Sequence, residues 1–330
     1  MSAHLEIVIP VYNEMAVLPQ LFATLEDVFS AKRAREAGIS KVTCTLIDDG
    51  SRDGTPDWIA KRIPSSPLHV RLISLSRNFG HQSAVSAGLS QSVGDLVAVI
   101  DADLQDPPSV IYEMVAKHRE GFDVVYGVRK KRKENFIKKF AYWAFYRLYK
   151  FLSSVTVPLD AGDFALMTRR VVVEMNALSE TLRFPRGLRA WVGFRQTGIP
   201  YERAKRAEGE SKYGFKELYK LASNGITSLS TKPLHLTQVL AVGYMFLMVF
   251  FMLYLTNRFF HPVLLQRDTL VILCFLCFSN LLIMATLHIH GSYIGRGYME
   301  MKGRPNFIIA SIESNESKEP TRPASLGAQS

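Results

Sequence analysis

Two long uncharged stretches in the C-terminal third of the chain most constrain its fold. They span residues 234–255 and 269–290, and neither contains an Asp, Glu, Lys or Arg. As an α-helix, each is long enough to cross a hydrocarbon layer about 30 Å thick. A pair of buried core helices is the alternative, but two such stretches close together favour a helical hairpin that spans a membrane.

Basic residues beside these stretches predict the orientation of the hairpin. The connecting loop carries two of them, whereas the outer flanks carry five: Lys220, Lys232, Arg296, Lys302 and Arg304. Because Lys and Arg accumulate on the cytoplasmic side of membrane proteins, both outer flanks are expected in the cytoplasm. Residues 2–13 resemble a strand rather than the basic and apolar regions of a secretory signal peptide. The sequence therefore predicts an integral membrane protein with a cytoplasmic N-terminal domain.

The first 230 residues alternate between strand-like and helix-like patterns. Strands are predicted at residues 5–12, 42–49, 70–76, 96–101 and 123–128, and helices at 15–36, 56–63, 81–92 and 108–120. Strands that alternate with helices are typical of βαβ units. The predicted fold class is therefore α/β, with a Rossmann-like, mostly parallel sheet.

Composition divides the chain into four parts. Residues 1–212 form the predicted α/β domain, and residues 213–232 form a juxtamembrane amphipathic helix. Residues 233–291 hold the hairpin, and residues 292–330 form a cytoplasmic C-terminal segment. From Ser311 onward, this last segment is rich in Ser, Glu, Pro and Lys, which is typical of disordered chain.

The strand predicted at 96–101 ends in a pair of carboxylates, Asp101 and Asp103, followed by Gln105. Ligands of open α/β sheets bind beyond the carboxyl ends of the strands. Mg²⁺ and Mn²⁺ prefer oxygen ligands, and one or two carboxylates with substrate phosphates are a common arrangement for Mg²⁺. The pattern therefore predicts a divalent metal at Asp101, Asp103 and Gln105. An acidic turn that begins the next helix is the structural alternative.

Other predicted strands also end in polar residues or in glycine, so that a nucleotide pocket could form at one edge of the sheet. Gly50 and Gly80 would let the backbone approach a ligand closely. Each of these strand ends alone has a sequence that is common in turns, but their occurrence after successive strands favours a common site. The candidate residues for binding the nucleotide-containing substrate are Pro10, Tyr12, Glu14, Asp48, Asp49, Asn78, Gly80, Asp101 and Ala102.

A basic segment at residues 129–152 combines clustered Lys and Arg with aromatic residues. Juxtamembrane basic residues attract anionic lipids, and aromatics beside them suit a helix at headgroup depth. Binding of RNA is the alternative, because basic patches with aromatics can also stack bases. Concentration of the charge in one segment favours the lipid and argues against a nucleic-acid partner.

Several motifs together resemble glycosyltransferase family 2. They are Ile-Val-Ile-Pro-Val-Tyr-Asn-Glu (7–14), Asp-Asp-Gly-Ser (48–51), Asp-Ala-Asp-Leu-Gln-Asp-Pro-Pro (101–108) and Ala-Gly-Asp-Phe (161–164). Gly-Glu-Ser-Lys-Tyr (209–213) and Tyr-Ile-Gly-Arg (293–296) resemble the branch of polyprenyl-phosphate glycosyltransferases related to dolichol-phosphate mannose synthase. One departure is Ser292, where that branch usually has an acidic residue.

The resemblance implies a GT-A fold, a nucleotide-sugar substrate, a divalent metal and a membrane-embedded polyprenyl phosphate acceptor. It assigns Asp48 or Asp49 to the nucleoside and Asp163 to the reaction centre. Asp101, Asp103 and Gln105 would serve the metal and diphosphate. UDP is favoured over GDP by likeness to bacterial members with a two-helix hairpin, so the bacterial inner membrane is the expected location. The sequence leaves the sugar and homo-oligomerisation open.

Cations are needed wherever a carboxylate lies near a phosphate dianion. The candidates for holding the acceptor phosphate are Arg129, Lys138, Lys139 and Lys212. Each could instead be a cation that only binds the membrane surface. A processive polysaccharide synthase and a non-enzymatic membrane scaffold on the same fold are the two alternative functions. The first typically has more membrane spans and a Gln-x-x-Arg-Trp motif, which this chain lacks.

Overall fold

The computed structural model of the chain describes residues 2–129, 147, 161–203, 227, 230–260 and 265–315. The chain divides into two compact units. The first, here called the α/β unit, contains residues 1–133, 157–212 and 305–330. The second, here called the hairpin unit, contains residues 134–156 and 213–304. Most of the predicted basic segment at 129–152 and of the predicted helix at 213–232 lies outside the described residues.

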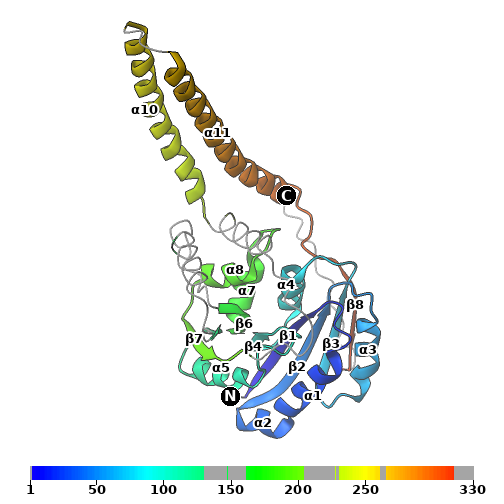
Figure 1. The fold of residues 1–330 in the computed structure, drawn as a ribbon. Coiled ribbons are helices and arrows are strands. Elements are labelled where there is room, and N and C mark those ends of the chain that lie inside the picture. Colours follow the sequence, from blue (N-terminus) through cyan, green and yellow to red (C-terminus); the bar gives the residue numbers. More distant parts are fainter. Residues whose placement is uncertain are drawn as a thin grey trace, which may run out of the picture. The chain divides into compact units, whose positions relative to one another are not determined.

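A mixed, mostly parallel sheet forms the centre of the α/β unit (Figure 1). The order of its strands is β7-β5-β6-β4-β1-β2-β3-β8. Only β6 and β8 run antiparallel to their neighbours among the described strands, which confirms the predicted fold class. The strands are β1 (Ala3–Val11), β2 (Ile39–Asp48), β3 (His69–Leu75), β4 (Leu96–Val99), β5 (Val124–Arg129), β6 (Ala161–Thr168), β7 (Gln196–Tyr201) and β8 (Ile309–Ser314).

Helices bury both faces of this sheet, because each presents an apolar stripe to it. One hydrophobic core includes Leu18, Ile59 and Ile111, and the other includes Ala84 and Leu188. The first core packs under α1 (Leu18–Val28), α2 (Ala31–Glu36), α3 (Thr55–Arg62), the short 3₁₀ helix η1 (Ile63–Ser65) and α5 (Val110–Arg119). The second packs under α4 (His81–Gln91), α7 (Arg169–Ala177) and α8 (Pro185–Trp191).

Small residues allow α4 to approach the sheet closely. A β-carbon added to Gly88 would lie 2.4 Å from Cγ1 of Val8 and 2.8 Å from Cδ1 of Ile47. Such distances are sterically impossible without movement of the neighbours, so glycine is required here. The close packing fixes the first residues of α4, His81 and Gln82, relative to the ends of β1 and β2.

The topology brings distant parts of the chain to one edge of the sheet. β1, β2, β3, β4, β5 and β7 are parallel, so their carboxyl ends share an edge. β6 is antiparallel to both β4 and β5, so it begins at this same edge with Ala161 and Gly162. Asp163 is therefore placed beside the residues that follow β4, although some sixty positions separate them in sequence.

The C-terminal segment contains a strand that the sequence did not predict. Disorder was expected from Ser311 onward, yet residues up to Ser314 belong to β8, which pairs with β3. The Asn315 side chain extends this pairing, since its Oδ1 accepts from Val70 N–H at 3.0 Å and its Nδ2 donates to Leu68 O at 2.9 Å. β8 covers an edge strand, and its six residues divide equally between apolar and polar, so its hydrophobic pattern is too weak to reveal it.

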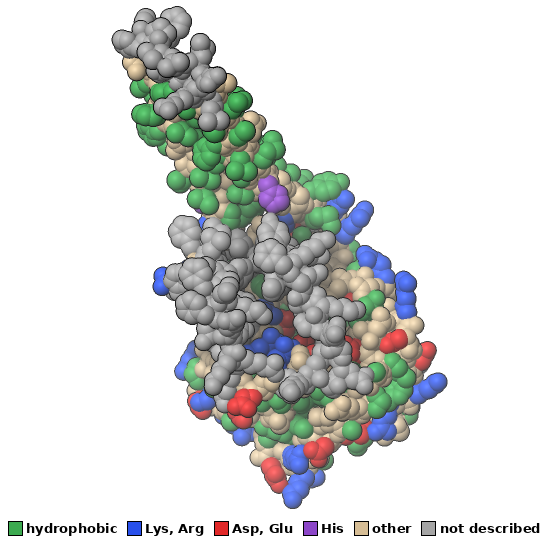
Figure 2. Space-filling view, in the orientation of Figure 1, with side chains coloured by type: hydrophobic (Ala, Val, Ile, Leu, Met, Phe, Trp, Pro, Cys, Tyr) green, Lys and Arg blue, Asp and Glu red, His purple; other side chains and the backbone are tan. Residues whose placement is uncertain are grey.

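The hairpin unit contains α10 (Lys232–Phe260) and α11 (Leu265–Met301). Both are long and apolar enough to cross a membrane, over Lys232–Asn257 and Val271–Met301. Phe251 of α10 stacks on Phe275 of α11 with ring centroids 3.8 Å apart. Figure 2 shows that hydrophobic side chains dominate the visible outer surface of the pair. Both predicted spans are therefore helical, and α11 continues beyond the predicted end at residue 290.

Candidate active site

The loop after β4 carries the predicted metal ligands. Ile100 N–H still bonds to Val8 O at 3.1 Å, and the chain then leaves the sheet at Asp101. Asp103 Oδ1 accepts a hydrogen bond from Gln105 N–H at 3.1 Å, and Leu104 between them has a φ of +55°. This tight turn keeps the Asp101 and Asp103 side chains at the edge of the sheet, where the side chain of Asp101 is 31% exposed.

The two carboxylates fit a divalent cation only if a substrate completes its coordination. No group of three or more His, Cys, Asp or Glu side chains forms a metal site in the part of the chain that the structure describes. Burial and three nearby carboxylates raise the pKa of Asp101 to about 6, against the opposing effect of His81. Two carboxylates with phosphate oxygens from a substrate suit Mg²⁺ or Mn²⁺.

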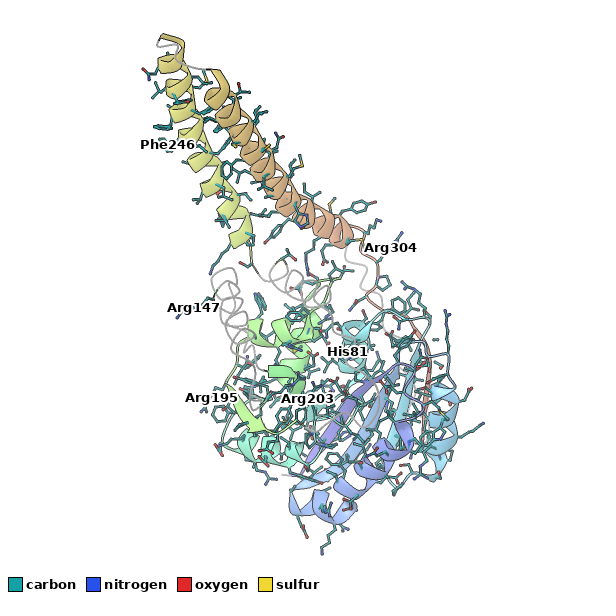
Figure 3. The ribbon with its side chains drawn as sticks, in the orientation of Figure 1. His81, Arg147, Arg195, Arg203, Phe246 and Arg304 are labelled. Carbon is teal, nitrogen blue, oxygen red and sulfur yellow. The ribbon has the colours of Figure 1, made fainter. Side chains whose placement is uncertain are left out.

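Asp163, the predicted residue at the reaction centre, lies in a cluster of cations. Its Oδ2 is 3.2 Å from Gln82 Nε2, 3.4 Å from Arg186 Nη2 and 3.5 Å from His81 Nε2. His81 also lies 3.8 Å from Asp101 Oδ1. It stands at the first turn of α4 (Figure 3) and is 45% exposed. His81 therefore links the carboxylate after β4 with the carboxylate of β6.

The cations around Asp163 keep it ionised. Burial alone would raise its pKa, but Arg186, His81 and Arg189 together lower the pKa of Asp163 well below its usual range. Arg189 is itself almost fully buried and donates to Gly162 O at 3.4 Å. A carboxylate with so low a pKa is a weak base. The surrounding cations therefore stabilise the charged form of this carboxylate.

Arg129 belongs to a second network at the same edge. Its Nε donates to Tyr201 Oη at 3.4 Å, and Tyr201 Oη donates in turn to Asp106. Asp106 is buried and also pairs with Arg203 Nε at 3.5 Å. A β-carbon added to Gly162 would lie 3.1 Å from Nη2 of Arg129. The guanidinium thus reaches the residue that directly precedes Asp163.

Asp49 connects two of the predicted substrate-binding segments. Its Oδ1 accepts from Phe79 N–H at 2.7 Å, and its Oδ2 accepts from Gly80 N–H at 2.9 Å. Gly50 has a φ of +71°, and a β-carbon there would lie 2.6 Å from the backbone of Arg77. The turn after β2 is therefore locked to the segment that begins α4, and both carboxylate oxygens of Asp49 bind backbone.

The remaining candidates for nucleotide-sugar binding surround this junction. Asp48 is buried and accepts from Ser51 N–H at 3.2 Å. Tyr12 and Asn78 are exposed, whereas Pro10 and Ala102 are buried. The loop of Glu14 is joined to the start of α3, because Glu14 N–H donates to Thr55 Oγ1 at 3.1 Å. The structure thus brings these segments to one edge, while the predicted roles of the individual residues remain predictions.

Three of the predicted phosphate-binding cations, Lys138, Lys139 and Lys212, lie outside the described residues. The structure in turn adds functional candidates that the sequence did not reveal. These are His81, Gln82, Asp106, Arg186, Arg189, Tyr201 and Arg203. His81 follows a predicted strand end and Asp106 belongs to the metal motif, so both gave a sequence signal. Gln82 lies on the predicted helix at 81–92, but nothing in the sequence marked it as functional. The others lie on β7, just after it or on the short helix α8, and no pattern predicted these elements.

Comparison with known proteins identifies the class to which this site belongs. A family model described as Glycosyl transferase family 2 matches residues 6–175, and this chain belongs to that family. A protein named "Uncharacterized glycosyltransferase YkcC", from Bacillus subtilis (strain 168), is 40% identical over 324 residues. The match covers 96% of this chain and 97% of that relative.

Other relatives carry more specific names. The "SfII prophage-derived bactoprenol glucosyl transferase" of Shigella flexneri is 36% identical, with 92% of this chain and 97% of the relative covered. Among solved structures, one similar chain is the mannosyltransferase PcManGT from Pyrobaculum calidifontis, in complex with GDP-Man and Mn²⁺. It is 14% identical with a TM-score of 0.46, and the match covers 91% of this chain and 88% of that one.

Replacement of Asp49 by asparagine tests the junction between β2 and α4. An amide offers one acceptor oxygen in place of two, and its NH₂ group would face a backbone N–H. We expect Asp49→Asn to lower the free energy of unfolding by about 1–3 kcal/mol and to raise KM for the nucleotide sugar. Urea unfolding in detergent micelles and initial rates measure the two effects. The control Asp57→Asn, at an exposed position of α3, should change neither, and an unaltered Asp49→Asn protein would contradict the structural role.

Proposed function

We propose that the protein transfers a sugar from a UDP-sugar to a membrane polyprenyl phosphate by an inverting single displacement. The observation that carries this proposal is the meeting of opposite charges at one sheet edge. Asp101 and Asp103 fit a cation-bound diphosphate, and Arg129, a candidate for binding a second phosphate, reaches Gly162 beside Asp163. Relatives named bactoprenol glucosyl transferase support the lipid acceptor and favour glucose as the sugar.

In this mechanism an oxygen of the acceptor phosphate attacks the anomeric carbon, and the nucleoside diphosphate leaves with the electron pair of the broken bond. A phosphate monoester has a second pKa near 6, so most of it is dianionic at pH 7. The nucleophile therefore needs no strong base, in keeping with the low pKa of Asp163. Arg129 would bind and orient the phosphate, while Asp163 orients groups at the reaction centre. Mg²⁺ or Mn²⁺, held by Asp101, Asp103 and Gln105, would supply stabilisation of the charge on the leaving diphosphate.

The hairpin accounts for access to a lipid. The chain leaves the α/β unit before α10 and returns to it after α11, where β8 pairs with β3. A hairpin that spans the membrane therefore keeps both of its ends on the side that holds the α/β unit. The excess of basic residues on these flanks supports the cytoplasmic side of the membrane. The phosphate of a polyprenyl lipid lies at a membrane surface, and an enzyme that the hairpin anchors in the same membrane would meet its acceptor there.

A panel of radiolabelled nucleotide sugars tests the proposed reaction. The full-length protein in detergent micelles is mixed with each nucleotide sugar and a short polyprenyl phosphate, and labelled lipid is extracted into organic solvent. We expect one UDP-sugar to give a labelled lipid whose formation requires the phosphate. Release of label into water without lipid product would instead indicate hydrolysis. Growth of a polymer would indicate a processive synthase, and no reaction at all would favour a scaffold.

The metal proposal predicts a large effect at Asp103. We expect Asp103→Asn to reduce kcat by about 100-fold or more, because an uncharged amide binds and polarises a divalent cation poorly. EDTA should abolish wild-type turnover, and added Mg²⁺ or Mn²⁺ should restore it. Thermal unfolding of the variant should match that of wild type, since Asp103 is partly exposed. Turnover that survives both EDTA and this substitution would rule out the metal.

The phosphate proposal predicts a selective effect at Arg129. We expect Arg129→Ala to raise KM for the polyprenyl phosphate by about 10- to 100-fold, the range for loss of a charged hydrogen bond. KM for the nucleotide sugar should change much less. Arg35→Ala, at an exposed position of α2, is the matched control. Equal changes in both KM values would show that Arg129 supports the fold of the site instead of binding the acceptor.

A further inference from the structure

The two carboxylate oxygens of Asp163 have different surroundings. Oδ2 is held by Gln82, Arg186 and His81 at 3.2–3.5 Å. Oδ1 is buried and has no hydrogen-bond partner among the described residues. One oxygen therefore fixes the position of the carboxylate, and the other keeps its capacity to accept a hydrogen bond.

Two neighbouring side chains also have a buried polar atom without a hydrogen-bond partner. Gln82 Oε1 and Arg186 Nε are also buried and unpaired within the described parts of the chain, although both side chains contact Asp163. A buried polar atom without a partner costs about 1–3 kcal/mol, and most such atoms in folded proteins are paired. Gln82 and Arg186 both contact Oδ2 of Asp163, and each of the three side chains keeps one unpaired buried atom. This indicates a site that a bound ligand completes.

The chemistry of these atoms selects the ligand group. Asp163 Oδ1 and Gln82 Oε1 are acceptors, so the ligand must offer hydrogen-bond donors. The ionised phosphates of the two substrates offer only acceptors, so they cannot satisfy these two oxygens. A hydroxyl group both donates and accepts, so hydroxyls can satisfy the two acceptors and the N–H of Arg186.

The position of the cluster matches the sugar of the nucleotide sugar. His81 contacts both Asp163 and Asp101, at 3.5 and 3.8 Å, and Asp101 belongs to the proposed diphosphate site. The transferred sugar is bonded directly to the diphosphate. Its hydroxyl groups are therefore the donors expected next to Asp101.

We propose that Asp163 and Gln82 recognise hydroxyl groups of the transferred sugar, and that His81 and Arg186 position the Asp163 carboxylate for this contact. This inference rests on the proposed function and extends it to the choice of sugar. A site built to bind a hydroxyl rejects an analogue that lacks it, because buried polar groups are then left unpaired. Gln82 is the more informative residue to change, since it carries no charge and stands outside the proposed metal site.

The experiment combines changes in the enzyme with changes in the sugar. The values of kcat/KM are measured for the best UDP-sugar and for each of its monodeoxy analogues, with wild type, Gln82→Ala and Gln91→Ala. Gln91 lies at the opposite end of α4 and serves as the matched control. We expect wild type and the control to lose about 5- to 10-fold with one analogue, as for a neutral hydrogen bond. Gln82→Ala should lose little or nothing with that same analogue.

Each other result has a distinct meaning. For each analogue, the fold-loss of kcat/KM in wild type is compared with that in Gln82→Ala. If the two losses are equal for every analogue, the inference is overturned and the proposed function stays intact. Failure of wild type to transfer any sugar to polyprenyl phosphate would overturn both. Gln82→Met, which keeps the length of the side chain without an acceptor oxygen, replaces the alanine variant if that protein does not fold, and it carries the same expectation.

Discussion

The pairing of buried carboxylates with cations or backbone N–H groups is the interaction on which the active edge of this protein depends. Several Asp side chains gather where the parallel strands end, and such a concentration of negative charge is unstable without compensation. Asp163 is compensated by Arg186 and His81, and Asp106 by Arg203. Burial is the main cause of the raised pKa of Asp101, and three nearby carboxylates add to it against the opposing effect of His81. Asp101 and Asp103 remain the predicted ligands of a divalent cation at this edge.

This arrangement of charge requires close packing beneath it. Gly88 lets α4 approach β1 and β2, and Gly50 lets the turn after β2 contact the backbone that precedes α4. Gly127 has a comparable role, because a β-carbon there would lie 2.7 Å from the ring of Tyr201 and 2.8 Å from that of Phe164. The two rings meet edge to face, 5.3 Å apart. Tyr201 belongs to the network of Arg129 and Asp106, and Phe164 directly follows Asp163, so Gly127 leaves room for the rings beside both.

The connection to the hairpin also follows from the sheet. The chain re-enters the α/β unit after α11, and Ser83 of α4 donates a hydrogen bond to Asn306 at 2.8 Å. β8 then pairs with β3 and removes an exposed strand edge. The segment after the hairpin is thereby joined to the same helix that carries His81 and Gln82. Both contacts, Ser83 with Asn306 and β8 with β3, lie within the α/β unit.

The sequence alone determined the elements whose pattern is local. Buried strands with continuous apolar runs, the uncharged stretches of the hairpin and the Asp101–Gln105 motif could all be predicted, because each depends on composition or short spacing. The helix predicted at 15–36 is also present, but the structure divides it into α1 and α2 at Phe29 and Ser30. Tertiary structure decided what depends on strand order. The antiparallel insertion of β6 brings Asp163 to Gln82 and His81, β7 brings Tyr201 to Arg129, and α8 supplies Arg186. None of these pairings has a sequence signal, since the partners are distant along the chain and meet only when the sheet is assembled.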